Sequence, residues 1–540
     1  MPKSHLPFRS LLLVLLAACL AACSTIPVQE PQIPTQRLDG YEQTPLAVML
    51  KSVLPSDGRS GFLLQPYGPN SFATRLELTR LATKSLDVQY YLLANDNTGR
   101  SLMRALRDAA ARGVHVRVLL DDLYTAGEDQ LLLGLASYPN VEIRLFNPFP
   151  GGRNGDISRF IASGLDFSRV NRRMHNKLFV ADNSAAVFGG RNMSDAYVQN
   201  AGGLNFIDMD TFAAGPVVRA LSAQFDTYWN SEVVYPLGQI ARSGLSPAQL
   251  RRDFERQTAS ARPPEIGEIP SDGIPLHQGP GEPGSAMQDV IPMINLPFDL
   301  RRHTVGRLLL AHARVLSDSP IKAEGVNDGN NTLDGTVTKG IIDWFHSSHQ
   351  SITMVSPYFV PSDAAVKSLV EARQEGIRVR LVTNSLASTD EPWVNVGYSA
   401  HLRKLIAAGV DVEEISPSLA VKRRRLGIFG KRTAALHMKC AIVDGRQVFL
   451  GSMNLDQRSA KLNTELGVII ESSEMAQQLA SLSDDGSSYR VRLSTTTNSI
   501  EWVEQAENGA EIVYSVPPET TAWQRFWLRI QGPFVPEREL

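Results

Sequence analysis

One pattern of polar residues occurs twice in this chain of 540 residues. Each copy has the form His-x-Lys-x(4)-Asp and continues in the same register into a glycine followed three residues later by an asparagine. The positions are His175, Lys177, Asp182, Gly189 and Asn192 in the first copy and His437, Lys439, Asp444, Gly451 and Asn454 in the second. Such a repeat indicates two copies of one supersecondary unit, so the fold is expected to contain two equivalent halves.

The residues upstream of each copy indicate the same secondary structure in both halves. Gly113 and Gly376 end helical patterns and precede the apolar runs 114–120 and 377–382. Glycine at a helix exit supplies a left-handed cap, and continuous apolar runs are typical of buried parallel strands. The sequence therefore predicts an α/β fold with two pseudo-twofold-related halves, each a mixed, largely parallel sheet flanked by helices.

In each half the motif lysine and aspartate flank a short apolar run, 178–181 or 440–443, that is predicted to be a strand. Alternation along the strand directs the histidine and the lysine to the same side of the sheet. The glycines after the next apolar run are expected to turn the chain so that Asn192 and Asn454 face the same spot.

Composition divides the rest of the chain. Residues 262–300 are rich in proline and glycine, which is typical of a linker or a surface excursion. Near the C-terminus, Trp523, Phe526 and Trp527 are expected to dock on the body of the protein rather than to bind a ligand. The expected divisions are a signal peptide over 1–23, a tether over 24–57, the first half over 58–260, a linker or excursion over 261–330, the second half over 331–480 and a C-terminal segment over 481–540.

The first residues indicate export. Lys3 and Arg9 precede an apolar stretch that is shorter than the ~20 apolar residues of a membrane span. The tetrad ending at Cys23 resembles a bacterial lipoprotein cleavage box, whose cysteine is lipidated, and the tetrad ending at Cys19 fits the same pattern. Cys23 is favoured because a longer apolar stretch precedes it and a proline-rich tether follows it. An ordinary cleaved signal peptide is the alternative. By resemblance to such lipoproteins, the lack of an aspartate after the cysteine indicates the outer membrane, facing the periplasm.

Charge limits the partners that the chain can bind. The formal net charge is −2, so there is no global basic field, and nucleic acid is not expected as a partner. Two local basic stretches with apolar neighbours, 153–173 and 422–432, precede the two motifs. Cations among leucine, isoleucine and phenylalanine suit an anionic phospholipid surface with shallow insertion. A solvated loop is the alternative for each stretch.

Brought together, the two copies would form a pocket with two imidazoles, two ammonium groups and two amides. Lysine and asparagine side chains suit the non-bridging oxygens of a phosphate, so the chemistry requires no metal and no other cofactor. One imidazole can attack phosphorus while the other, protonated, delivers its proton to the leaving alkoxide. Asp182 and Asp444 are expected to hold the opposite ring nitrogens and so to fix the tautomers.

These residues resemble the phospholipase D superfamily, whose signature is His-x-Lys-x(4)-Asp followed by Gly-x-x-Asn, and the resemblance covers about residues 60–475. A finer resemblance is to the cardiolipin synthases of the C type. It rests on the blocks 174–177, 189–192, 215–218, 225–231, 356–361, 383–390 and 451–459. The chain departs from the family pattern at Gly190, where serine is common, at Asn395, where histidine is expected, and at Gln457, where proline is usual.

The resemblance implies a covalent phosphohistidine intermediate, with His175 as the usual nucleophile and His437 as the general acid and then base. Spacing alone does not decide which histidine has which role. It also implies that Glu465 and Asp208, downstream of the motifs, pair with the imidazoles or help to bind substrate together with the two motif asparagines. Ordinary structural carboxylates are the alternative for both.

The implied activity is that of a monomeric phosphatidyltransferase, working at an anionic phospholipid surface, that makes cardiolipin from phosphatidylglycerol and a second phospholipid. The donor lipid, phosphatidylglycerol or phosphatidylethanolamine, stays open. The alternative is a phospholipase D-type hydrolase of phospholipids, or an exported nuclease, because water can resolve the same intermediate. The near-neutral charge disfavours the nuclease.

Overall fold

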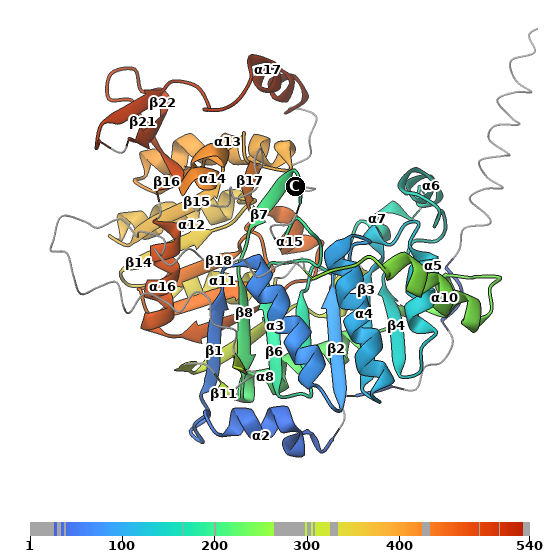
Figure 1. The fold of residues 1–540 in the computed structure, drawn as a ribbon. Coiled ribbons are helices and arrows are strands. Elements are labelled where there is room, and N and C mark those ends of the chain that lie inside the picture. The colour runs from blue at the N-terminus through green and yellow to red at the C-terminus, as the bar shows by residue number, and fades with distance from the viewer. Residues whose placement is uncertain are drawn as a thin grey trace, which may run out of the picture.

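The computed structural model has two large β-sheets with a shared core between them and helices on their outer faces (Figure 1). The expected signal peptide, with Cys19 and Cys23, and the basic residues 424–432 lie outside the part of the chain that the structure describes. The described residues are 26–29, 34–36, 39–164, 166–198, 201–263, 298–299, 304–305, 308–324, 333–423, 433–484, 486–506 and 508–532.

The strands form one nine-stranded and one ten-stranded sheet. In spatial order the first contains β12 (Leu309–Ala311), β1 (Ser60–Gln65), β8 (Asp210–Ala214), β6 (Ala185–Gly189), β5 (Leu178–Ala181), β2 (Ser85–Tyr90), β3 (His115–Asp121), β4 (Val141–Phe146) and β9 (Val234–Pro236). The second contains β13 (Ala313–Ser317), β20 (Leu466–Glu471), β19 (Gln447–Gly451), β18 (Cys440–Val443), β14 (Ser351–Val355), β15 (Arg378–Asn384), β16 (Asp411–Ile415), β21 (Ser488–Leu493), β22 (Ile500–Gln505) and β23 (Glu511–Tyr514). Two small pairs are β10 (Phe298–Asp299) with β11 (Thr304–Val305) and β7 (Leu204–Ile207) with β17 (Thr433–Leu436).

Helices follow the strands in both halves. The first half contains α2 (Pro45–Lys51), α3 (Gly68–Leu81), α4 (Asn97–Ala111), α5 (Asp129–Ala136), α6 (Asp156–Ala162), α7 (Phe167–Val170), α8 (Pro216–Trp229), α9 (Leu237–Ile240) and α10 (Pro247–Thr258). The second contains α11 (Val337–His346), α12 (Asp363–Gln374), α13 (Pro392–Ala407), α14 (Pro417–Arg423), α15 (Gln457–Lys461), α16 (Ser473–Ser483) and α17 (Ala522–Gln531). Short 3-10 turns are η1 (Tyr41–Gln43), η2 (Asp122–Tyr124) and η3 (Pro320–Glu324). Within the described ranges, no helix has the length and apolar character needed to cross a membrane.

The two sheets repeat one topology, as the duplicated pattern predicts. The order β8-β6-β5-β2-β3-β4-β9 in the first matches β20-β19-β18-β14-β15-β16-β21 in the second. The prediction of a mixed sheet is confirmed, but its largely parallel character is wrong. Among the described strands of the two sheets, only β2–β3, β3–β4, β14–β15 and β15–β16 pair in parallel. Short turns after β5 and β18 return the chain as antiparallel hairpins.

The motif strands are buried on both faces. In β5, Leu178 and Val180 enter the core that the two halves share, while Phe179 and Ala181 pack toward the outer helices. The shared core also contains the apolar face of α8 and residues of β18, β19 and β20. The two halves therefore close on one another through a continuous apolar layer.

Backbone pairing also connects the halves beside the motifs. Strand β7 of the first half pairs in parallel with β17 of the second. At the equivalent place on the other side of the pseudo-twofold axis, Met174 forms an isolated bridge with Thr464. His437 and His175 directly follow these contacts, so the motif histidines are fixed at the junction of the halves.

Candidate active site

Each motif histidine is held by the main chain of the opposite half. The backbone N–H of His175 donates to the carbonyl of Thr464 at 2.9 Å, and that of His437 donates to the carbonyl of Ile207 at 2.7 Å. Both side chains are buried, with 7% and 4% exposed. The residues after the two accepting carbonyls are Glu465 and Asp208, so each carboxylate is delivered to the imidazole of the other half.

Glu465 contacts the ring of His175 through both carboxylate oxygens. Nδ1 of the imidazole lies 3.1 Å from Oε1 and 3.0 Å from Oε2. The hydroxyls of Ser452 and Ser459 donate to Oε2 and Oε1 at 2.5 and 2.8 Å. Burial raises the pKa of Glu465 to about 7, against the opposing effect of Lys177. A carboxylate placed in this way fixes the Nδ1–H tautomer of His175.

Asp208 makes the equivalent contact with His437, with Oδ2 2.7 Å from Nδ1. The ammonium of Lys439 approaches the same ring nitrogen at 2.8 Å. The other carboxylate oxygen accepts the backbone N–H of Met209 at 2.7 Å. Burial raises the pKa of Asp208, while Lys439 and Arg191 oppose the rise. Nδ1 of His437 is therefore shared between an acid and a cation, unlike Nδ1 of His175.

The two motif lysines are buried with the histidines, at 1% exposed for Lys177 and 2% for Lys439. Each ammonium donates to the carbonyl of the histidine two residues earlier, at 2.7 Å in the first half and 2.5 Å in the second. Burial lowers the pKa of Lys177 well below 10.5 and that of Lys439 to about 8, and Glu465 and Asp208 respectively are the leading opposing charges. Two buried cations within electrostatic reach of one another favour the binding of an anion.

Burial lowers the pKa of both imidazoles well below 6.5, and the two lysines act in the same direction. His175 is also among the groups that lower the pKa of His437, so the two rings lie within electrostatic reach of one another. The negative charge of a phosphodiester opposes the lysines, so its binding would raise these pKa values and allow one imidazole to carry the transferred proton.

The expectation that Asp182 and Asp444 hold the imidazoles is wrong. The carboxylate of Asp182 accepts backbone N–H groups of residues 83–85 at 2.7 to 3.2 Å. That of Asp444 accepts those of residues 349–351 in the same way. Both residues have positive φ, 47° and 53°. They therefore anchor the turn before strands β2 and β14 and hold β5 and β18 in register.

Asn192 lies beside His437, and Asn454 is buried at the equivalent place of the other half. Nδ2 of Asn192 donates to the hydroxyl of Tyr197 at 3.0 Å, and that hydroxyl lies 3.3 Å from Nε2 of His437. Oδ1 of both asparagines is buried without a hydrogen-bond partner among the described residues. These oxygens can accept a hydrogen bond from a bound hydroxyl group.

Sequence reasoning gave no role to several residues that contact the imidazoles. Tyr91 and Tyr197 lie edge-on to His175 and His437, with ring centroids 5.1 and 5.0 Å apart. No motif marks either tyrosine. Ser459, in contrast, lies within a sequence block that resembles the cardiolipin synthases. The block marks its position as functional, but nothing in the sequence predicts its contact with Glu465.

Three arginines of the first basic stretch, Arg153, Arg159 and Arg173, do not face a lipid surface as expected. Arg159 and Arg173 are 1% and 0% exposed, and Arg153 is largely buried. Arg153 pairs with Asp122 at 3.0 Å, and Arg173 pairs with Asp121 at 3.2 Å. These arginines fix the loop that precedes the first motif, because buried charges require partners.

The arrangement suits displacement at a phosphodiester through side chains of the protein alone. Two imidazoles can act as nucleophile and as acid, and two ammonium groups can offset the charge that develops on the phosphoryl oxygens. Within the described part of the chain, no three His, Cys, Asp or Glu side chains are grouped so that they could hold a metal ion.

Comparisons with known proteins agree with this geometry. A family model described as "Cardiolipin synthase, PLD-like domain" matches residues 76–229 and 341–484, and so covers both motifs. The chain is 35% identical over 481 residues to cardiolipin synthase C of Escherichia coli (strain K12), covering 88% of this chain and 94% of that relative. It is 23% identical over 459 residues to cardiolipin synthase A of Pseudomonas syringae pv. syringae (strain B728a), covering 84% and 74%. Among solved structures, phosphatidylserine synthase of Haemophilus influenzae Rd KW20 aligns over 90% of this chain and 96% of its own, with a TM-score of 0.52 and 14% identity, which shows a shared fold.

Proposed function

Because the chain belongs to the cardiolipin synthase family of phospholipase D-like proteins, we propose that it transfers a phosphatidyl group to phosphatidylglycerol and so makes cardiolipin. One observation carries the proposal: each motif histidine meets a carboxylate of the opposite half, beside two buried lysines. This pairing supports two successive displacements at one phosphorus atom. A single chain supplies both imidazoles and both carboxylates, which supports a monomeric enzyme.

In the first step, Nε2 of His175 forms a bond to phosphorus and the bond from phosphorus to the leaving alkoxide breaks. His437, whose imidazole is protonated on both nitrogens, gives its Nε2 proton to that alkoxide and is left neutral. The unequal contacts support these roles. Glu465 holds a proton on Nδ1 of His175 and so leaves the lone pair on Nε2. Asp208 can accept a hydrogen bond from Nδ1–H of His437, which stabilises the protonated ring, and the Tyr197 hydroxyl can accept one from Nε2–H.

In the second step, His437 removes the proton from a hydroxyl group of phosphatidylglycerol. The resulting oxygen attacks phosphorus and displaces Nε2 of His175, which restores the free enzyme. Lys177 and Lys439 stabilise the charge on the phosphoryl oxygens in both steps. If water replaces the acceptor alcohol, the same intermediate yields phosphatidic acid.

The substrates are membrane lipids, and we place the enzyme at the bacterial cell envelope. We propose lipidation at Cys23, with the body of the protein facing the periplasm from the outer membrane. Incorporation of labelled palmitate should be lost in Cys23→Ser and kept in Cys19→Ser. The reverse result would assign the anchor to Cys19.

The experiment that tests the function uses a bacterial strain without cardiolipin synthases. Expression of this chain should restore cardiolipin, measured by mass spectrometry, and the variant His175→Ala should not. Good expression without cardiolipin, or with phosphatidic acid alone, would reject the transferase. With purified enzyme and defined lipids, release of glycerol identifies phosphatidylglycerol as the donor, and release of ethanolamine identifies phosphatidylethanolamine.

A further inference from the structure

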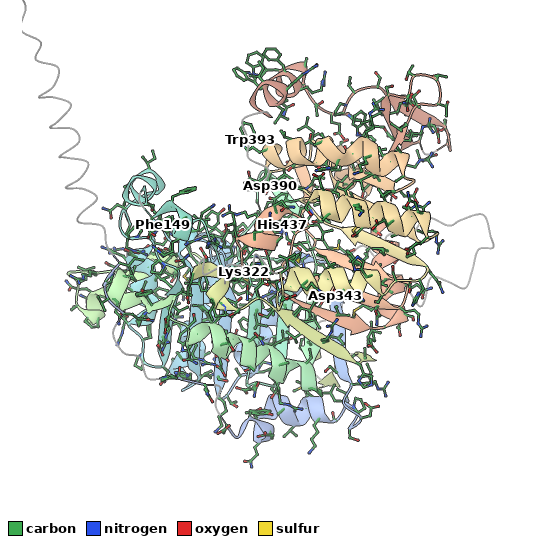
Figure 2. All side chains as sticks on the ribbon, turned by 180° about the vertical axis from the view of Figure 1, so that it is seen from behind. Phe149, Lys322, Asp343, Asp390, Trp393 and His437 are labelled. Carbon is green, nitrogen blue, oxygen red and sulfur yellow. The ribbon has the colours of Figure 1, made fainter. Side chains whose placement is uncertain are left out.

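Helix α17 exposes a continuous apolar stripe. Trp523, Phe526, Trp527 and Ile530 follow one another at helical spacing and are 64, 52, 39 and 44% exposed. Figure 2 shows side chains of this helix projecting away from the body of the molecule. The expectation that the C-terminal aromatic residues dock on the body is therefore wrong.

The aromatic rings of α17 pack on one another. The ring centroids of Trp523 lie 5.9 Å from those of Phe526 and 5.3 Å from those of Trp527. The helix meets the body from its other side, where Gly532 lies against Val396 of α13. The rings thus form a cluster whose outer surface faces solvent, an arrangement that costs free energy in water.

The sequence keeps this short helix formed. An isolated helix of ten residues is marginal in water, and here a capping box between Thr521 and Gln524 stabilises its start. The helix contains Arg525 and Arg529 and no acidic residue. Tryptophan and phenylalanine on one face and arginine on the other are typical of a helix that lies in the interface of an anionic bilayer.

The place of α17 fits a lipid partner better than a protein partner. It packs on α13, whose first turn carries Trp393, 36% exposed, and Figure 2 shows Trp393 between α17 and the active-site residue His437. On the other half, Ile157 of α6 and Phe167 of α7 are 80 and 52% exposed. In Figure 1 these two helices and α17 stand on the same side of the molecule. A flat apolar surface can touch α17 and the crest formed by α6 and α7 at once, while the active site lies between them.

We propose that α17 is a membrane-docking helix whose aromatic stripe enters the headgroup region of an anionic phospholipid bilayer and brings the mouth of the active site to the lipid. The choice of partner rests on the proposed function, because the substrates of a phosphatidyltransferase reside in that bilayer. The crest formed by α6 and α7 is the second point of contact. A second copy of this chain is the competing occupant of the stripe.

The test measures quenching of tryptophan fluorescence in the full-length protein on vesicles of phosphatidylethanolamine and phosphatidylglycerol with brominated acyl chains. An N-terminal lipid anchor would hold every variant on the vesicle, so quenching reports insertion of the rings and not tethering. Two of the six tryptophans are in α17, and Trp229, Trp344 and Trp502 are buried. The wild type should be quenched, and Trp523→Ser/Trp527→Ser should lose most of that quenching.

The matched control is Val48→Ser, which removes an apolar side chain that is 59% exposed on α2, at the opposite end of the molecule from α17 (Figure 1). This control should be quenched like the wild type. Equal quenching in wild type and double variant, or no quenching in the wild type, would overturn the proposal. So would a lipid-free dimer that becomes a monomer in Trp523→Ser/Trp527→Ser, because the stripe would then be a self-association surface.

Activity separates this inference from the proposed function. The double variant should make cardiolipin on vesicles about tenfold more slowly, since the interfacial contact is lost, and should keep its rate on monomeric dioctanoyl phosphatidylglycerol, which also shows that it is folded. Trp523→Phe/Trp527→Phe keeps the apolar stripe and should restore the vesicle rate. If the wild type is quenched but makes no cardiolipin, the proposed function is rejected and the docking helix is supported. If it makes cardiolipin without quenching, the docking helix is rejected and the proposed function is supported.

Discussion

The two histidine sites have the same backbone plan and different surroundings. At His175 the partner is a glutamate that two serine hydroxyls hold, one on each oxygen. At His437 the partner is an aspartate that shares the ring nitrogen with a lysine. The repeated topology therefore places the two imidazoles equivalently, while their different neighbours give the two rings unequal chemistry.

One pair of equivalent positions shows that the choice of acid is coupled to the residue packed against it. Ser452 of the second half corresponds to Gly190 of the first. A Cβ atom at Gly190 would collide with the carboxylate of Asp208. The shorter acid lies so close to the chain that a side chain at residue 190 would displace its carboxylate. The longer Glu465 leaves room for a serine that donates to it. The departure from serine at residue 190 thus has a steric cause.

The largest expected effect comes from removing each imidazole. His175→Ala and His437→Ala should each slow transfer by about 10⁴-fold or more, as for other residues that act as a unit. The two variants should differ in the partial reaction that each retains. With a p-nitrophenyl leaving group, which needs no proton, His437→Ala should still form a covalent phosphoenzyme, and His175→Ala should not. Rapid-quench mass spectrometry measures the adduct; an adduct on His437 in the His175→Ala variant would reverse the roles.

Neutralising the two carboxylates should have the next largest effect. Glu465→Gln and Asp208→Asn keep the shape of each side chain but lose the acceptor that fixes the imidazole tautomer. Each should lower kcat by about 10³-fold. Glu465→Gln should slow formation of the adduct even with the p-nitrophenyl substrate, because it acts on the nucleophile. Asp208→Asn should spare that step, and single-turnover kinetics distinguishes the two. Equal slowing of that step would contradict the division of labour.

Exchanging the equivalent small residues should have an intermediate effect. Gly190→Ser crowds Asp208, and we expect activity to fall by about 10- to 100-fold. The free energy of unfolding should fall by about 1–3 kcal/mol. Ser452→Gly removes one hydrogen bond to Glu465, and about 1 kcal/mol of stability and a several-fold loss of rate are expected. Urea unfolding and steady-state kinetics measure both. A harmless Gly190→Ser would show that the collision is relieved by movement of Asp208.

The pH dependence should have the smallest amplitude. The pKa of Glu465 is raised to about 7, so as pH falls through 7 its carboxylate takes up a proton and stops accepting from His175. The pKa of Lys439 is lowered to about 8, so as pH rises through 8 its ammonium is lost and KM should increase. The rate should therefore peak between these values. In Glu465→Gln the residual rate should lack the acid limb, and in Lys439→Arg the alkaline limb should move to higher pH.

Much of the fold could be predicted from the sequence because it depends on local pattern. Gly113 and Gly376 have the positive φ, 96° and 88°, that a left-handed helix cap requires. The prediction of largely parallel sheets is wrong, because apolar runs do not reveal whether a strand is followed by a hairpin or by a crossover connection. The prediction was also wrong for Arg153, Arg159 and Arg173, since the sequence does not distinguish arginines in buried ion pairs from arginines on a lipid-facing surface.

The site residues were found but not all of their partners. Asp182 lies five residues beyond Lys177, and a strand rises about 3.3 Å per residue, so β5 carries the aspartate to the far end of the sheet from the imidazole. The resemblance implied that Glu465 and Asp208 pair with the imidazoles, and the structure shows both contacts. That each carboxylate comes from the opposite half could not be predicted. It depends on how two sheets pack, which no spacing within either motif encodes.

The exchange of carboxylates across the junction has a mechanical consequence. A rotation that parts the halves would withdraw Glu465 from His175 and Asp208 from His437 in the same movement. Neither imidazole could then keep its tautomer, and an opened molecule would be unable to begin a phosphoryl transfer that it could not finish. Each half therefore depends on the other for the carboxylate that orients its imidazole.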